Sequence, residues 1–143
     1  MPYKFVEEIG TADIAFEATG RDLPELFAAA ADATMNVMIE NLNGIEPRET
    51  RGIELKSDAI DMLLFDFLQE LIYFKDAERL LLRVHEAEID EKDGHYFLKT
   101  TTAGERLDVA RHQQRCDVKA VTLHGFRVEK SDGGWEAAVL LDI

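Results

Sequence analysis

The feature that most constrains the fold is an apolar run in the middle of the chain. Residues 60–73 read IDMLLFDFLQELIY. At helical spacing these apolar residues cover a wide arc of the helix surface, and such a face has to be buried against another layer. Ser57-Asp58 stands just ahead of the run and is typical of a helix start. We therefore predict a main core helix that packs on a β-sheet.

A second helix is predicted earlier in the chain. Asp22-Leu23-Pro24-Glu25 combines a capping acid, a proline in the first turn and a glutamate three residues after the acid, which together indicate a helix N-terminus. The apolar stripe that follows at helical spacing consists of Leu23, Leu26, Phe27, Ala30, Ala31, Val37 and Met38. We expect this helix to fade within residues 41–44, because Pro47 prevents it from continuing.

The remaining segments favour strands, at residues 3–8, 10–18, 51–55, 80–89, 95–102, 117–129 and 135–143. Asp93-Gly94 and the Ser-Asp-Gly-Gly sequence of residues 131–134 are hairpin turn signals. Apolar residues occupy both odd and even positions of the last two strands, which predicts central strands covered on both faces. The order of elements predicts an α+β fold: a single-domain two-layer sandwich, with a mostly antiparallel or mixed sheet and two helices packed on one face.

Composition limits the possible partners. The formal net charge is -13 and the sequence pI is about 4.6, so the surface repels phosphate backbones and anionic membranes. A cation or a basic protein partner suits it, although the excess acid also serves solubility alone. Cys116 is the one cysteine, so no disulfide forms within the chain. The absence of an apolar signal segment at the start favours a cytoplasmic protein. Nothing here indicates an oligomeric state.

Motifs for several chemistries are absent. The sequence contains no glycine-rich dinucleotide or P-loop motif, no G-x-S-x-G elbow and no C-x-x-C pair. Cys116 follows His112 by four residues, but one Cys and one His do not complete a zinc site. His124 is either a core histidine with one backbone partner or a general base. Lys119 either extends its side chain from the strand end or points at a site.

Two acids near the ends of the sequence form a hypothesis of their own. Alternation in residues 10–18 puts Ile14 and Phe16 on one face and Asp13 on the other. Asp142 is the single acid in the apolar run of residues 139–143. The simplest interpretation of Asp13 is a solvated face. If the two acids meet, their carboxylates and a main-chain or terminal oxygen suit a hard cation such as calcium or magnesium.

Five segments, taken in order, resemble the archease family. They are residues 11–15 (TADIA), residues 63–73 (LLFDFLQELIY), Gly104-Glu105 with Asp108 and His112, residues 118–125 (VKAVTLHG) and residues 135–143 (WEAAVLLDI). The resemblance covers nearly the whole chain and implies one archease-like domain over residues 1–143. It also implies an accessory protein rather than an enzyme.

Archeases activate the RtcB-type RNA ligase, which joins a 2′,3′-cyclic phosphate or 3′-phosphate end to a 5′-hydroxyl end, as in tRNA splicing and RNA repair. They promote guanylylation of the ligase histidine and multiple turnover. The resemblance therefore implies the ligase as the partner, and the acidic charge disfavours strong direct binding to nucleic acid or membrane.

The resemblance also implies a divalent-metal site, with calcium as the cofactor and magnesium or manganese as alternatives. Its ligands correspond to Asp13, Asp142 and Ile143. Four further residues match family positions as functional neighbours: Lys119, His124, Asp108 and His112. The chain departs from the family at Gly10, where a histidine usually precedes Thr-Ala-Asp, so the surroundings of the site are expected to differ.

One hypothesis joins these observations. The acidic end of the protein approaches the basic nucleotide-binding mouth of the ligase, and a cation on Asp13 and Asp142 acts there. It either neutralises charge on the transferred phosphoryl group or stabilises the conformation competent for guanylylation. Two other classes stay open: a small metal-dependent hydrolase that uses the two acids with His112 and His124, and a chaperone-like protein-interaction module.

Overall fold

The computed structural model describes residues 2–6 and 13–143. Its elements are β1 (Tyr3–Val6), β2 (Asp13–Gly20), α1 (Leu23–Met38), the short 3-10 helix η1 (Leu42–Gly44), β3 (Glu49–Ser57), α2 (Ile60–Glu78), β4 (Leu80–Lys92), β5 (His95–Arg106), β6 (Ala120–Ser131) and β7 (Gly134–Asp142). Both helices and the strands lie where the sequence predicts them, and residues 7–12 of the predicted strands lie outside the described part. Neither α1 nor α2 has an apolar stretch long enough to cross a membrane.

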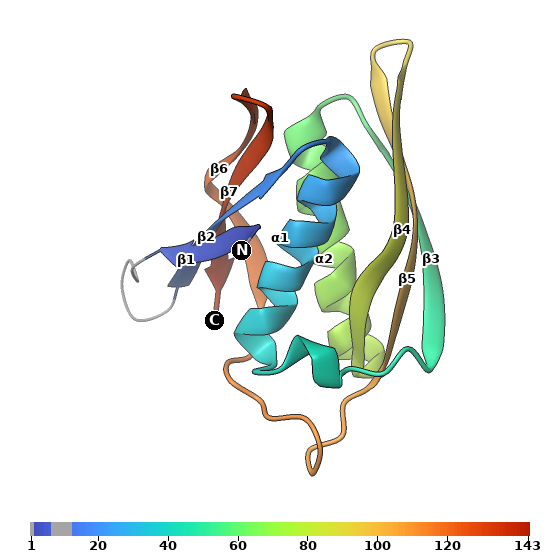
Figure 1. The fold of residues 1–143 in the computed structure, drawn as a ribbon, viewed down its shortest axis with the longest axis vertical. Helices are drawn as coiled ribbons and strands as arrows, with labels where there is room; N and C mark the ends of the chain where they lie inside the picture. Colours follow the sequence, from blue (N-terminus) through green and yellow to red (C-terminus); the bar gives the residue numbers. More distant parts are fainter. Residues whose placement is uncertain (1, 7–12) are drawn as a thin grey trace.

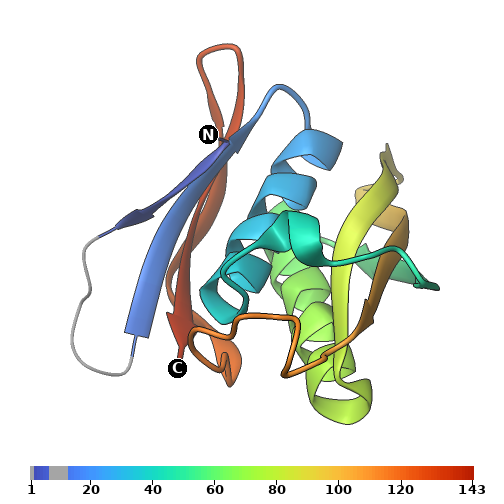
Figure 2. The same ribbon diagram turned by 60° about the horizontal axis from the view of Figure 1, so that its bottom comes forward.

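The described strands form two sheets in which every pairing is antiparallel. One sheet has the order β1-β2-β7-β6 and the other has the order β3-β5-β4. Figures 1 and 2 show α1 and α2 between the two sheets. The predicted α+β class, with two helices and antiparallel strands, is confirmed. The predicted layer count is corrected, because the helices carry a sheet on each side and the domain has three layers.

The physical reason for the third layer lies in α1. Its buried residues include the predicted stripe from Leu26 onward but also Ala29, Ala33, Thr34 and Met35, which lie outside that stripe. A helix that is apolar around most of its circumference is stable only when it is covered on more than one side. The ring of Phe27 stacks on Phe67 of α2 with centroids 5.9 Å apart. On the other side, Asp32 holds Arg83 of β4 through two hydrogen bonds of 3.0 Å.

The helix boundaries follow local chemistry. Asp22 caps α1 by accepting a hydrogen bond from the Glu25 N–H at 2.9 Å, as predicted. Helix α2 begins at Ile60, later than the Ser57-Asp58 signal suggests, because Ser57 still belongs to β3. It ends at Glu78 and is capped by Arg79, which adopts the left-handed conformation with φ 55°.

Strand β6 corrects a second prediction. It is an edge strand, so of the two strands predicted to be central only β7 has a neighbouring strand on each side. The register shifts between Thr122 and Arg127, which pair with Leu140 and Ala138, so β6 contains a large bulge with Gly125 at φ 67°. Because the bulge adds an odd number of residues to β6, the side chains that face the core have odd residue numbers before it and even residue numbers after it. This shift, rather than coverage on both faces, explains the apolar residues of both parities, and Leu123 is 61% exposed.

Candidate functional site

The two predicted acids are direct cross-strand partners. Asp13, the first residue of β2, lies opposite Asp142 in the β2–β7 register. Asp142 is also opposite Ala120 of β6, and the Lys119 N–H donates to its main-chain oxygen at 2.8 Å. The neighbouring pair Ile14 and Leu141 faces the core, so alternation puts both acids on the outer face of the sheet. The predicted meeting of the two acids is therefore present.

The chemistry of this pair fits a hard cation. Directly opposite residues on one face have Cβ atoms roughly 5 Å apart, so two carboxylates there converge and repel each other unless a positive charge lies between them. Carboxylate oxygens are the ligands that calcium and magnesium prefer. Within residues 2–6 and 13–143, however, no group of three or more His, Cys, Asp or Glu side chains is placed to hold a metal. Among the described residues, any further ligands would therefore be hydroxyl, side-chain amide, main-chain or water oxygens.

Three of the other predicted site residues, Ile143, Lys119 and His124, lie in or next to the strands β6 and β7. Ile143 directly follows β7 and is half-buried, and Lys119 is exposed just before β6 begins. His124 lies in the bulge of β6 and is exposed, so its interpretation as a core histidine is wrong. Gly10, the position of departure from the family, lies outside the described residues.

Asp108 and His112 belong to a different cluster. His112 is 4% exposed. Its Nδ1 accepts from the Asp108 N–H at 2.9 Å, and its Nε2 lies 2.9 Å from Oε2 of Glu105, an arrangement that requires the proton on Nε2. Burial raises the pKa of the Glu105 carboxyl, but hydrogen bonds from the Glu46 N–H, His112 and Arg111 outweigh it and lower that pKa to about 2. The cluster holds the connection between β5 and β6 against the rest of the domain.

In the described part of the chain, no hydrogen bond or ion pair joins this cluster to Asp13 or Asp142. His112 has both ring nitrogens occupied by Asp108 and Glu105. The sequence placed His112 in a polar loop, and loop composition alone does not reveal that its side chain is buried. Glu105 appeared only as part of the family resemblance, and its partners are too distant in sequence to be inferred from spacing.

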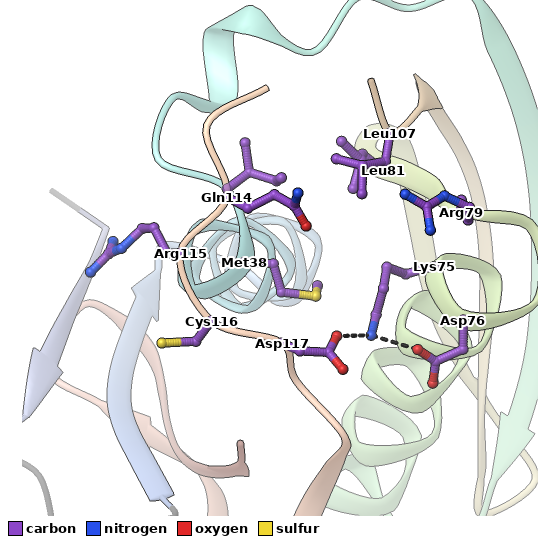
Figure 3. A pocket seen from close by; sticks show the side chains of 11 residues that line it. Met38, Lys75, Asp76, Arg79, Leu81, Leu107, Gln114, Arg115, Cys116 and Asp117 are labelled. Atoms are coloured by element: carbon purple, nitrogen blue, oxygen red, sulfur yellow. Dashed lines mark hydrogen bonds and ion pairs between the residues drawn. The ribbon is translucent and has the colours of Figure 1, made fainter. Parts of the chain in front are cut away.

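A cavity at the C-terminal end of α2 was not predicted. It measures about 340 Å³ and is shown in Figure 3. Its lining residues are Met38, Ile39, Lys75, Asp76, Arg79, Leu81, Leu107, Gln114, Arg115, Cys116 and Asp117. The side chain of Lys75, 12% exposed, pairs with Asp76 and Asp117 and donates to the Val118 main-chain oxygen at 3.1 Å.

Lys75 thereby anchors the segment that leads into β6. Burial lowers the pKa of Lys75, but its hydrogen bonds to Asp117 and Asp76 outweigh this effect and raise the pKa above its ordinary value. The anchored segment continues to Lys119, whose N–H binds Asp142. A lysine in the last turn of a helix is a common capping feature, so the sequence alone does not reveal this second role.

Known proteins match this chain over nearly its whole length. A model of the Archease protein family matches residues 3–143. The chain is 38% identical to protein archease of Pyrococcus abyssi over 134 residues, which cover 93% of this chain and 94% of the relative. It is 36% identical to protein archease of Archaeoglobus fulgidus over 143 residues, which cover 100% of both.

Similar folds also occur among solved structures, and two of them are compared with this chain below. The solution structure of Methanobacterium thermoautotrophicum protein 1598 has a TM-score of 0.85 and 37% identity, and the match covers 99% of each chain. The crystal structure of an archease, "possible chaperone", from Thermotoga maritima has a TM-score of 0.65 at 21% identity, over 96% of this chain and 97% of that one. The second likeness concerns the fold alone. The family match and the identities over nearly the full length lead to one conclusion: the chain belongs to the archease family.

Proposed function

We propose that this protein is an accessory activator of an RtcB-type RNA ligase in the cytoplasm. It promotes guanylylation of the ligase and multiple turnover in tRNA splicing or RNA repair. The observation that carries the proposal is the direct pairing of Asp13 with Asp142 on the outer face of a sheet. Neither side chain serves the core there, and two like charges placed opposite each other destabilise the sheet unless a positive charge lies between them.

Each residue of the site has a role in this proposal. Asp13 and Asp142 hold a divalent cation, with calcium as the favoured ion, and Ile143 supplies a further oxygen. The cation supplies positive charge that offsets the negative charge of a phosphoryl group. The Lys119 N–H fixes the main chain of Asp142, and Lys75 holds the segment before it. The net charge of -13 attracts the protein to a basic surface on the ligase.

The arrangement of the histidines disfavours the hydrolase alternative. That interpretation needs His112 beside the two acids, but His112 is buried and bound by Glu105 and Asp108. His124 is exposed in a bulge of an edge strand. An accessory role needs neither a general base nor a nucleophile in this chain, which is the simpler account of the site.

The test is a guanylylation and multiple-turnover ligation assay with the ligase from the same cell. We expect wild-type protein to accelerate both, and Asp13→Asn and Asp142→Asn to lose activation by about tenfold or more, as substitutions at metal sites commonly do. The matched control is Glu17→Gln, because Glu17 lies on the same face of β2 but opposite Ala138. Full activation by both Asp variants, with unchanged circular dichroism, would contradict the proposal.

The description "possible chaperone" given to the Thermotoga maritima protein supports a second candidate, a protein-interaction module that acts on unfolded chains. An aggregation assay with an unrelated protein separates the two functions. Equal protection by wild type and Asp13→Asn, combined with no effect on the ligase, would favour the module. Loss of ligase activation in Asp13→Asn without any effect on aggregation favours the activator.

A further inference from the structure

We infer that one side of α2 is a docking surface for an amphipathic helix of a partner protein, a helix that carries Lys or Arg beside its apolar face. This inference goes beyond the proposed function and does not depend on it. The surface is a groove of about 450 Å³, called the α2 groove here, and its lining residues are Leu55, Phe65, Asp66, Gln69, Glu70 and Tyr73. Leu55 belongs to β3, and the other residues belong to α2.

The two helices differ in how their outward sides are covered. On α1, this side is bonded to the edge strands β1 and β4. The Tyr3 hydroxyl donates to Asn36 Oδ1 at 3.3 Å, and Arg83 donates two hydrogen bonds of 3.0 Å to Asp32. Asp32 and Asn36 are one helical turn apart, so these bonds close that side of α1 with paired polar groups.

The corresponding side of α2 lies beside the edge strands β3 and β6 and is less completely covered. Towards β6, Gln69 Oε1 accepts from the Val121 N–H at 3.0 Å, and the ring of Phe65 meets that of Phe126 edge-on at 5.5 Å between centroids. One turn beyond Gln69, the side chain of Tyr73 is 59% exposed. An exposed aromatic ring that borders a groove with a polar rim is typical of a protein interaction site.

Two acids of the α2 groove determine the charge of the partner. Asp66 and Glu70 are one turn apart, so their like charges repel and weaken the helix. In the part of the chain that the structure describes, neither has an ion pair or a side-chain hydrogen bond, whereas Glu78 of the same helix binds Arg51 at 2.8 Å and Asp76 also has an ion pair. A partner with Lys or Arg at this place would remove the repulsion and supply the missing pairs.

The spacing of the groove residues determines the shape of the partner. Phe65, Gln69 and Tyr73 follow one another at four-residue intervals and form a row about 12 Å long. Asp66 and Glu70 form an acidic row beside it. An amphipathic helix presents the complementary pattern, because its apolar side chains and its Lys or Arg side chains also recur at this interval.

Two other occupants fit the α2 groove less well. A second copy of this chain would bring a molecule with a net charge of -13 against Asp66 and Glu70. A nucleic acid would bring its phosphates against the same two acids. Both arrangements place negative charge against negative charge, which opposes association.

The inference is tested by fluorescence anisotropy with a labelled amphipathic peptide of leucine and lysine, about 18 residues long. We expect saturable binding by the wild-type protein. Tyr73→Ala should weaken binding about tenfold, because a tyrosine at the centre of an interface carries much of the affinity. Glu70→Lys should weaken it about fivefold, because repulsion replaces attraction. Since Tyr73 is largely exposed, urea unfolding of Tyr73→Ala should match that of wild type.

Glu88→Lys is the matched control. It makes the same change in net charge at an exposed position of β4, opposite Lys99, and should retain the wild-type affinity within about twofold. Equal losses in Glu88→Lys and Glu70→Lys would overturn the inference, because the attraction would then reflect net charge alone. Wild-type affinity in Tyr73→Ala, or no saturable binding by the wild-type protein, would also overturn it.

The other occupants are tested with the same variants. Sedimentation equilibrium measures self-association, and anisotropy with a labelled single-stranded RNA measures binding of nucleic acid. We expect neither to depend on Tyr73. Self-association of the wild-type protein that Tyr73→Ala abolishes would assign the α2 groove to a second copy, and RNA binding that Tyr73→Ala abolishes would assign it to nucleic acid. Either result would overturn the inference.

Discussion

Replacing Asp142 by asparagine should have opposite effects on stability with and without a divalent cation. Asp13 and Asp142 carry like charges directly opposite each other on one face of the sheet. Asparagine keeps nearly the same volume and removes one of the charges. Without a cation, we expect Asp142→Asn to be more stable than wild type. With the cation, we expect it to be less stable, because a ligand is lost.

The magnitude follows from the spacing. Two unit charges about 5 Å apart repel by about 0.8 kcal/mol at the dielectric constant of water and about 3 kcal/mol at an effective value of 20. Both acids are half-exposed, which favours the lower figure, so a gain of about 1 kcal/mol is expected in EDTA. A cation at 100 times its Kd stabilises wild type by about 2.7 kcal/mol. Asp142→Asn should then be about 2 kcal/mol less stable than wild type.

The assay is urea unfolding at pH 7 in EDTA and in saturating CaCl₂. Glu17→Gln is the control, because it removes a charge of the same face that lies opposite Ala138 rather than another acid. This variant should not gain stability in EDTA beyond a few tenths of a kcal/mol. The reasoning is refuted if Asp142→Asn is no more stable than wild type in EDTA, or if Glu17→Gln gains as much.

Two further predictions concern the fold that supports the site. Gly104→Ala should lower the free energy of unfolding by about 3 kcal/mol or more, because a Cβ there would lie 1.7 Å from the Leu81 main-chain oxygen. Gly52→Ala should leave the free energy of unfolding unchanged or raise it slightly in the same urea assay, because its Cβ meets nothing within 4 Å. The pKa of Glu105 is lowered to about 2, so its contribution to stability is complete above its unfolded pKa and is lost as pH falls from about 4.5 toward 2. Urea unfolding from pH 7 to pH 2 should therefore show a smaller decrease, by up to about 3 kcal/mol, in Glu105→Gln than in wild type; equal decreases would contradict this assignment.

The elements that sequence predicted well are those specified by neighbouring residues. Asp22 caps α1 through Glu25, three residues away. Asp93-Gly94 turns β4 into β5 with both residues at positive φ. Turn and cap chemistry acts over a few residues, so it can be recognised without knowledge of the fold.

The elements that sequence missed depend on residues far apart. The predicted single layer of strands assumed a one-sided α1, whereas Ala33 and Met35 are also buried. The bulge that shifts parity in β6 is visible only from its register with β7. His112 is buried by contacts with Glu105, which a polar loop sequence does not reveal. The meeting of Asp13 and Asp142 came from a hypothesis supported by family resemblance, since strand pairing is not encoded locally.

The pairing of β2 with β7 has a consequence for how the protein reaches its active form. The two acids come from opposite ends of the sequence, and they face each other only after the sheet closes through β7. Non-local strand pairing of this kind is slow to form because a long loop must be ordered first. A chain that is still incompletely folded therefore lacks the site, and a cation that binds it holds the sheet closed. Under the proposed function, cation binding would therefore follow the completion of folding, and only fully folded molecules would activate the ligase.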